Sequence, residues 1–225
     1  IIPHILESFL RLIYHNKNLI RKLSEYVTPE RIEILNNVLN KRTRYMTVVI
    51  EDIYHSHNAS AVMRTCECFG IQDLHVIENF NKFEIHPNIV RGASKWLTIS
   101  QYNEQTNNTL NAIKYIKERG YRIVTTTPHE KGVDLFSFDV TKGPFAIVIG
   151  SEKTGASKEM MDLSDEYLTI PMVGFTESLN LSVSAALVVS HLYRAIEKES
   201  LDISLKEDEK ELLMIQWLMK SIRNA

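Results

Sequence analysis

Residues 145–149, Phe-Ala-Ile-Val-Ile, form an uninterrupted apolar run that ends at Gly150. A continuous run of this kind is typical of a strand in a parallel sheet that is covered on both faces. Further strand patterns occupy residues 46–50, 74–77, 96–99, 121–127 and 167–170. Helical patterns alternate with them at residues 58–69, 105–119 and 180–198. The alternation predicts an α/β fold with a mostly parallel sheet and helices on both faces.

Helical extensions flank this core on both sides. Thr28-Pro29 is typical of a helix start, with Thr as the N-cap and Pro in the first turn. Together with a helical pattern over residues 4–24, it predicts a two-helix extension over residues 1–45. The core then spans residues 46–198. Residues 199–225 begin as a charged linker and end in an amphipathic helix.

The charge is unevenly distributed along the chain. The whole sequence has a net charge of −2, but residues 1–45 hold eight basic and four acidic residues. A basic arm on an acidic body indicates a polyanionic partner. A solvated helix face explains the same excess equally well.

Composition narrows the class of protein. The chain is 44% hydrophobic and 24% charged, as in soluble globular proteins, and we expect no membrane-spanning segment. Cys66 and Cys68 lie two residues apart in a helical pattern, which predicts neither a disulfide nor a metal site. No secretory signal is evident at the start, so we expect a cytoplasmic protein. No His, Cys and Asp residues have the spacing of a metal site, so we expect no bound metal.

Polar clusters follow three of the predicted strands. Ligands of parallel α/β sheets bind at the carboxyl ends of the strands, where such clusters meet. Each cluster also has a purely structural explanation, since Asn is a good helix N-cap and Glu-Lys-Thr-Gly is an acceptable turn. The clusters occupy residues 57–64, 150–155 and 178–180.

Several common catalytic motifs are absent. The sequence has no GxxxxGK[ST] phosphate loop, no GxGxxG after the first strand and no GxSxG elbow. His55 and His57 lie in the first strand-to-helix loop and could act as bases. Histidines at such positions are more often ordinary loop residues.

The three clusters together resemble the SpoU/TrmH-type RNA 2′-O-ribose methyltransferases of the SPOUT superfamily. The resemblance covers about residues 45–198, and the short helical arms are most similar to the tRNA guanosine-18 branch. Leu181 is the only departure, at a position where Val is commoner. The matching segments are Asn58-x-x-Ala61-x-x-Arg64-Thr65, residues 149–155 and Ile170-Pro171-Met172 with Ser178-Leu179-Asn180-Leu181-Ser182.

The resemblance implies a C-terminal trefoil knot and an S-adenosylmethionine pocket. The chain after the last strand would thread through an earlier loop, which is a rare exception to unknotted topology. Small residues such as Ser184 and Ala185 would let the following helix pack closely against the knot and a partner subunit, giving a homodimer. The residues expected to contact the cofactor are Thr126, Gly150, Ile170, Met172 and Leu179.

The resemblance also implies catalytic roles. Arg64 would grip the phosphate beside the target ribose, and it has been given the role of proton acceptor in the family. A guanidinium with a pKa above about 12 is a poor base, so positioning is the better founded role. Asn58 would hydrogen-bond near the ribose, and Glu152 would fix Arg64 or Asn58. Ser178 and Asn180 would order the loop and align the methyl donor.

The expected substrate is the D-loop guanosine at position 18 of tRNA. Larger ribosomal-RNA relatives carry a separate N-terminal domain, and the extension of this chain is too short to form one. Alternatives are a ribosomal-RNA methyltransferase, a non-catalytic RNA-binding module on the same fold, and a small-molecule α/β enzyme. The residues expected to grip RNA phosphates are Arg11, Arg21, Lys22, Arg42, Arg44 and Arg64.

Overall fold

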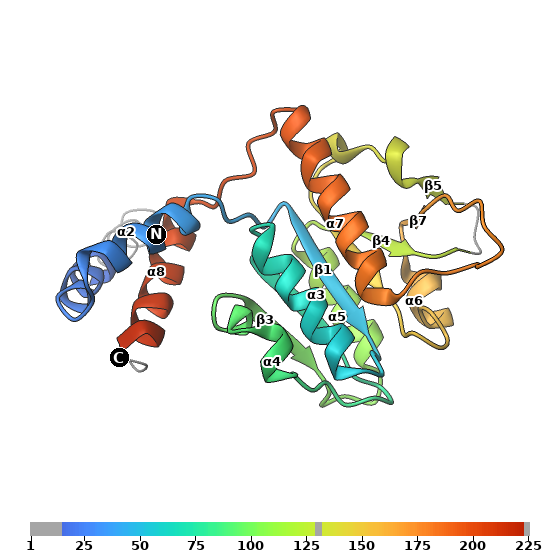
Figure 1. Cartoon of the computed structure of the whole chain (residues 1–225), viewed down its shortest axis with the longest axis horizontal. Coiled ribbons are helices and arrows are strands. Elements are labelled where there is room, and N and C mark those ends of the chain that lie inside the picture. Colours follow the sequence, from blue (N-terminus) through green and yellow to red (C-terminus); the bar gives the residue numbers. More distant parts are fainter. Residues whose placement is uncertain (1–14, 129–131, 223–225) are drawn as a thin grey trace, which may run out of the picture. The chain divides into compact units, whose positions relative to one another are not determined.

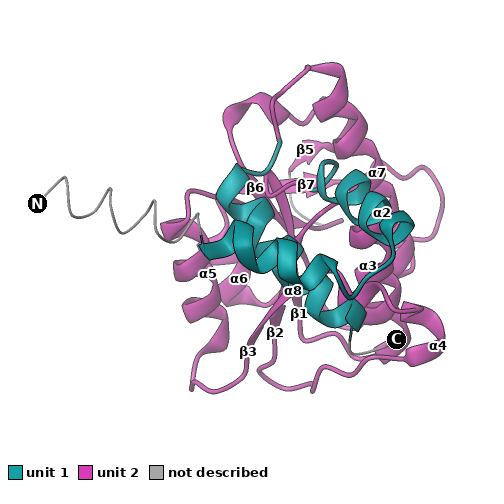
Figure 2. Ribbon diagram, turned by 90° about the vertical axis from the view of Figure 1, so that its left-hand side faces the viewer, with its two compact units in different colours: residues 1–42, 204–225 teal, residues 43–203 magenta. Residues whose placement is uncertain are grey.

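The computed structural model describes residues 15–128 and 132–222 of the 225-residue chain. The chain divides into two compact units (Figure 2). Unit 1 combines residues 1–42 with residues 204–225, and unit 2 contains residues 43–203. Unit 1 therefore draws on both of the expected extensions.

Unit 2 is built on a seven-stranded sheet with the order β3-β2-β1-β6-β4-β7-β5. Every strand pairing in it is parallel, so the predicted parallel α/β fold is confirmed. The strands are β1 (Met46–Glu51), β2 (Asp73–Ile77), β3 (Thr98–Tyr102), β4 (Arg122–Thr126), β5 (Val133–Asp134), β6 (Phe145–Ile149) and β7 (Glu166–Thr169).

Helices cover both faces of this sheet (Figure 1). Along β1, Met46, Val48 and Ile50 join the buried cluster that contains residues of α3 and α7. Val49 points to the other face and joins residues of α5 and α6. The helices of unit 2 are α3 (Ser56–Cys68), α4 (Pro87–Val90), α5 (Asn108–Glu118), α6 (Lys158–Leu163) and α7 (Leu181–Lys198), with 3₁₀ turns η1 (Ala93–Lys95), η2 (Leu135–Ser137) and η3 (Val140–Lys142).

Differences from the sequence prediction lie in the short elements. The third strand was expected at residues 96–99. The Trp96 amide instead donates a hydrogen bond to the Ala93 carbonyl and ends the η1 turn, so β3 begins at Thr98. Strand β5 has two residues and α6 has six, which is too short for a periodic pattern to show. Ser157 does mark the start of α6, because its hydroxyl accepts a hydrogen bond from the Met160 amide.

Unit 1 is helical. Residues 15–24 are helical, and α2 (Pro29–Leu39) begins at the predicted N-cap Thr28, whose hydroxyl accepts from the Arg31 amide. Helix α8 (Glu207–Ile222) packs against α2. No helix in the described part of the chain is both long and apolar enough to cross a membrane.

Candidate functional site

The parallel pairing of β1 with β6 creates the edge at which the polar clusters meet. Ile50 lies opposite Ile149 in the register, so the two strands end side by side. Strand β2 lies on the far side of β1 and β4 on the far side of β6. Chain connections therefore leave this point in opposite directions, which is where open α/β sheets bind ligands.

The carboxylate of Glu152 joins the loops that follow these two strands. It accepts hydrogen bonds from the amides of Tyr54 (2.8 Å) and His55 (3.1 Å) and from Nδ2 of Asn58 (2.8 Å). Asn58 is buried in the first turn of α3. Partial burial raises the pKa of Glu152, but the hydrogen bonds from Asn58, Tyr54 and His55 outweigh it and hold the pKa below its usual value.

Arg64 lies on the same helix as Asn58 but is not held by Glu152. Its side chain is exposed, and within the described part of the chain it forms no ion pair or hydrogen bond. Of the two partners that the sequence suggested for Glu152, the structure therefore shows Asn58. A free, exposed guanidinium is suited to an anion that arrives from solvent.

Gly150 shapes the second loop. The amides and carbonyls of Ser151 and Gly155 exchange two hydrogen bonds of 2.9 Å, which closes the loop tightly. A Cβ at position 150 would collide with the backbone of Gly155 and Ala156. This steric requirement is one reason for the glycine, and the cofactor contact expected for Gly150 stays a prediction.

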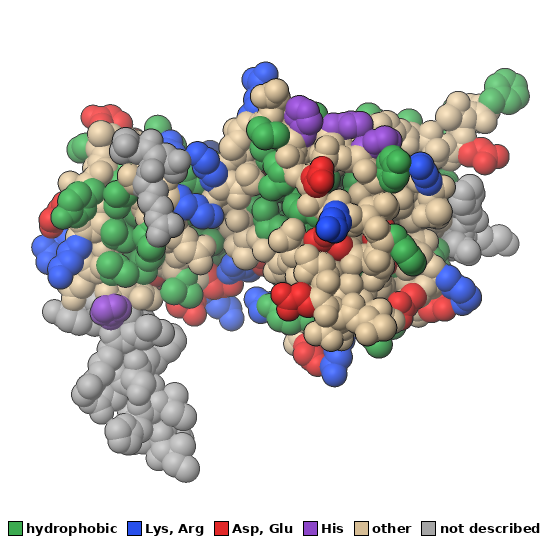
Figure 3. All heavy atoms as spheres, turned by 90° about the horizontal axis from the view of Figure 1, so that it is seen from below, with side chains coloured by type: hydrophobic (Ala, Val, Ile, Leu, Met, Phe, Trp, Pro, Cys, Tyr) green, Lys and Arg blue, Asp and Glu red, His purple; other side chains and the backbone are tan. Residues whose placement is uncertain are grey.

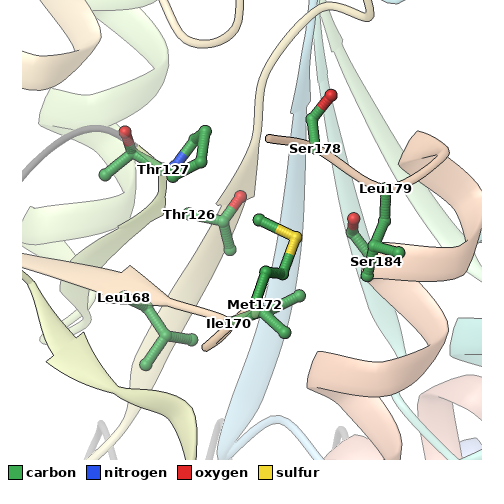
Figure 4. Close-up of a pocket in the computed structure, with 9 residues that line it drawn as sticks. Thr126, Thr127, Leu168, Ile170, Met172, Ser178, Leu179 and Ser184 are labelled. Carbon is green, nitrogen blue, oxygen red and sulfur yellow. The ribbon is translucent and has the colours of Figure 1, made fainter. Parts of the chain in front are cut away.

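A pocket lies between the ends of β4 and β7 and the start of α7 (Figure 4). Four of the five residues expected to contact the cofactor line it, together with Ser178. Four further lining residues were not expected to contact the cofactor, and their side chains converge only in the fold. The lining residues are Thr126, Thr127, Pro128, Leu168, Ile170, Met172, Ser178, Leu179 and Ser184.

The chemistry of this lining fits S-adenosylmethionine. The apolar side chains of Leu168, Ile170, Met172 and Leu179 suit the faces of an adenine ring and a thioether chain. Hydroxyl groups supply the polar contacts, and none of the nine described lining residues carries a charge that would repel a sulfonium cation.

Asn180 begins α7 next to this pocket. Its Oδ1 accepts hydrogen bonds from the amide (2.9 Å) and the hydroxyl (2.6 Å) of Ser182. The side chain is therefore an N-cap, which fixes where the loop ends and the helix starts. Its place in the site is that of a positioning residue, and Ser178 is the member of this pair that lines the pocket.

Two carboxylates at the end of β1 hold neighbouring segments of the site in place, and neither was predicted from the sequence. Glu51 is buried and accepts hydrogen bonds from the hydroxyls of Thr109 (2.7 Å) and Ser157 (2.8 Å) and from the Ser157 amide (2.8 Å). It thereby joins β1 to α5 and to the start of α6. An acidic residue at the end of an otherwise apolar strand was the available signal.

The second of these carboxylates, Asp52, anchors the first loop. It adopts a left-handed backbone conformation with φ of 49°. Its Oδ1 accepts from the amides of Asn79 and Phe80, each at 2.8 Å. This holds the turn from which the chain runs on to Tyr54 and Asn58.

The expected phosphate-binding residues divide into two groups. Arg21 and Lys22 are exposed. Arg42 is buried, with its guanidinium 5.3 Å from the ring centroid of Trp217. Arg44 is partly buried, with Nε 2.9 Å from Oδ2 of Asp73. We therefore correct the expectation for Arg42 and Arg44, because packing and ion pairing within the protein engage them. Arg11 lies outside the described residues.

Within residues 15–128 and 132–222, no three His, Cys, Asp or Glu side chains come together as a metal site would require.

The fold and site define an α/β protein with its ligand pocket at the strand ends of a parallel sheet, and comparison with known proteins identifies its family. The model of the SpoU rRNA Methylase family matches residues 45–190. This chain belongs to that family.

Two curated relatives match over most of their length. The tRNA (guanosine(18)-2′-O)-methyltransferase of Borreliella burgdorferi is 39% identical, with 90% of each chain covered. The protein of the same name from Aquifex aeolicus is 31% identical, with 88% of this chain and 93% of the relative covered. The crystal structure of the A. aeolicus TrmH/SpoU tRNA modifying enzyme matches with a TM-score of 0.76 at 28% identity, covering 85% of this chain and 96% of that one.

A pH dependence follows from the lowered pKa of Glu152. A depressed folded-state pKa contributes stability that is present above the unfolded value, about 4.3 for Glu, and is lost as the pH falls through the folded value. Glu152→Gln should therefore unfold more easily than the wild type at neutral pH, and the difference should narrow in acid. Urea denaturation from pH 7 to pH 3 measures it. A difference that stays constant over this range would contradict the assignment.

Proposed function

We propose that this chain transfers the methyl group of S-adenosylmethionine to the ribose 2′-hydroxyl of guanosine 18 in tRNA. The observation that carries the proposal is the Glu152–Asn58 hydrogen bond, which joins two of the segments that match the family. The names of the two relatives support the tRNA substrate. When bound, S-adenosylmethionine supplies an electrophilic methyl group, so the protein must orient the hydroxyl and help to remove its proton.

Orientation is the contribution that the described residues support best. Asn58 is held by Glu152 and offers its remaining amide atoms to the ribose or the cofactor. Ser178 lines the pocket on the side of α7, and Asn180 fixes the loop that carries Ser178. Arg64 binds the phosphate beside the target ribose through its free guanidinium. Correct placement of the reacting atoms can lower the barrier by several kcal/mol.

Replacing Arg64 tests this mechanism. Arg64→Ala should lose most methyl transfer to tRNA while its affinity for S-adenosylmethionine stays within a few-fold, because Arg64 is not among the pocket residues. The assay follows labelled methyl groups on unmodified tRNA, with tRNA carrying 2′-deoxyguanosine at position 18 as the control substrate. Methylation of the control tRNA would show that the methylated nucleotide is not guanosine 18. Transfer to ribosomal RNA alone would favour the ribosomal-RNA alternative. Near-normal turnover of Arg64→Ala would remove Arg64 from the mechanism.

The exposed basic residues of unit 1 supply phosphate contacts. Replacing Arg21 and Lys22 by Ala should weaken tRNA binding and reduce the slope of log K against log[salt] by about 0.7–0.9 for each lost contact. Lys158→Ala is the control, because that side chain is also exposed but pairs with Asp162 on α6. Titrations at several salt concentrations measure the slope, and an unchanged slope in the double variant would exclude these contacts.

The proposal includes the trefoil knot that the family resemblance implies. The segment after β7 lies beside the segment after β4, since Met172, Ser178 and Leu179 share the pocket with Thr127 and Pro128. This proximity supports threading of the C-terminal segment through the earlier loop. An experimental density map that traces the chain from residue 126 to residue 180 tests it, and an unthreaded path would refute it.

A homodimer is also part of the proposal. Val183 and Leu187 lie one turn apart on α7 with 47% and 46% of their surface exposed, and Val173 and Phe175 in the preceding loop are fully exposed. An apolar surface of this kind suits two-fold packing against a second copy. Leu187→Glu should shift the protein towards monomers in sedimentation. Leu110→Glu, at an equally exposed position of α5 (45%), is the control and should not. A wild-type monomer with full activity would refute the dimer.

A further inference from the structure

The loop between β1 and α3 carries a cluster of rings beside Asn58. The Tyr54 and His55 rings meet edge to face with centroids 4.8 Å apart, and the His55 and His57 rings stack with centroids 5.0 Å apart. The Lys153 ammonium lies 3.8 Å from the Tyr54 centroid. All four side chains are exposed. We refer to Tyr54, His55, His57 and Lys153 as the ring cluster.

The ring cluster is fixed relative to the proposed catalytic residues. The amides of Tyr54 and His55 donate to the same Glu152 carboxylate that binds Asn58. His57 precedes Asn58 directly in the first turn of α3. The rings are therefore held in place by the backbone, while their side chains face solvent at the ligand-binding edge of the sheet.

Packing within the chain does not explain the ring cluster. None of its members belongs to the buried core of unit 2. Among the described residues, the His57 ring pairs with the His55 ring alone, and the His57 side chain is exposed to solvent. Figure 3 views the molecule from the side towards which β1 runs in Figure 1, and His side chains gather on this face.

The ring cluster is also separate from the proposed cofactor pocket. The two share no residue, since the pocket is lined from β4, β7, the segments after them and α7. A ligand of the ring cluster therefore belongs to the substrate side of the site. Stacked rings with an ammonium group match an unstacked RNA base and its phosphate, because single-stranded RNA is recognised by aromatic stacking together with cations on the backbone.

We propose that an unpaired base of the RNA, from the methylated nucleotide or one next to it, stacks on the exposed ring of His57, and that Lys153 binds a neighbouring phosphate. This inference rests on the proposed RNA methylation. It gives the enzyme a means to hold its target nucleotide out of the RNA fold without reading a base edge.

Replacing His57 by residues of different kinds tests the stacking. His57→Leu keeps the bulk but removes the ring, so tRNA affinity should fall by about 5- to 100-fold, the loss typical of one stacked base. His57→Phe keeps the ring and should retain most of the affinity. Both variants should bind S-adenosylmethionine as the wild type does. Equal affinities for tRNA in the wild type and both variants would overturn the proposal.

A fluorescent base reports stacking directly. The probes are tRNA transcripts that carry 2-aminopurine at the methylated nucleotide or at either neighbour. Binding of the wild type should quench at least one of the three, and His57→Leu should lose that quenching at saturating protein, whereas His57→Phe should keep it. Quenching that survives in His57→Leu would show that the base stacks elsewhere.

Lys153 is tested by salt dependence. Lys153→Ala should make the plot of log K against log[salt] shallower by about 0.7–0.9, whereas Lys158→Ala should leave its slope unchanged. An unchanged slope for Lys153→Ala would remove the phosphate contact. If the wild type neither binds nor methylates tRNA or ribosomal RNA, the proposed function fails. If it methylates RNA but the His57 variants behave alike, only the ring cluster proposal fails.

Discussion

The parallel pairing of β1 with β6 is the constraint on which the site depends. With Ile50 opposite Ile149, the loops after both strands leave the sheet at one point. Glu152 can then accept hydrogen bonds from Tyr54, His55 and Asn58, which lie far from it in the sequence. A shift of this register by one residue would turn the side chains of a strand to the opposite face of the sheet and dismantle both the core and this contact.

Three carboxylates hold the loops of the site together. Glu51 joins the end of β1 to the start of α6, Asp52 joins the first loop to the turn after β2, and Glu152 joins the first loop to the loop after β6. Each accepts from backbone amides in another segment. Glu51 and Asp52 are buried, and buried polar groups that have their hydrogen-bond partners make a structure rigid, so these two carboxylates fix the start of the first loop.

The sequence revealed the parts of the fold that repeat a pattern and the parts of the site that match a family. Runs such as residues 145–149 predicted their strands because a strand buried on both faces is apolar throughout. The two-residue β5 shows no such pattern. Charge counting could not separate Arg42 from exposed arginines, because its partner Trp217 comes from the other end of the chain. The role of Glu51 likewise depends on Ser157, which only the fold brings near.

The geometry also limits which residue can take the proton from the ribose. Glu152 already accepts three hydrogen bonds, and they hold its pKa below the usual value, so it binds a proton weakly at neutral pH. A guanidinium such as that of Arg64 is a poor base. Asn58 and Ser178 are not bases at neutral pH. We therefore propose that the residues that the family resemblance implies orient the hydroxyl and stabilise charge.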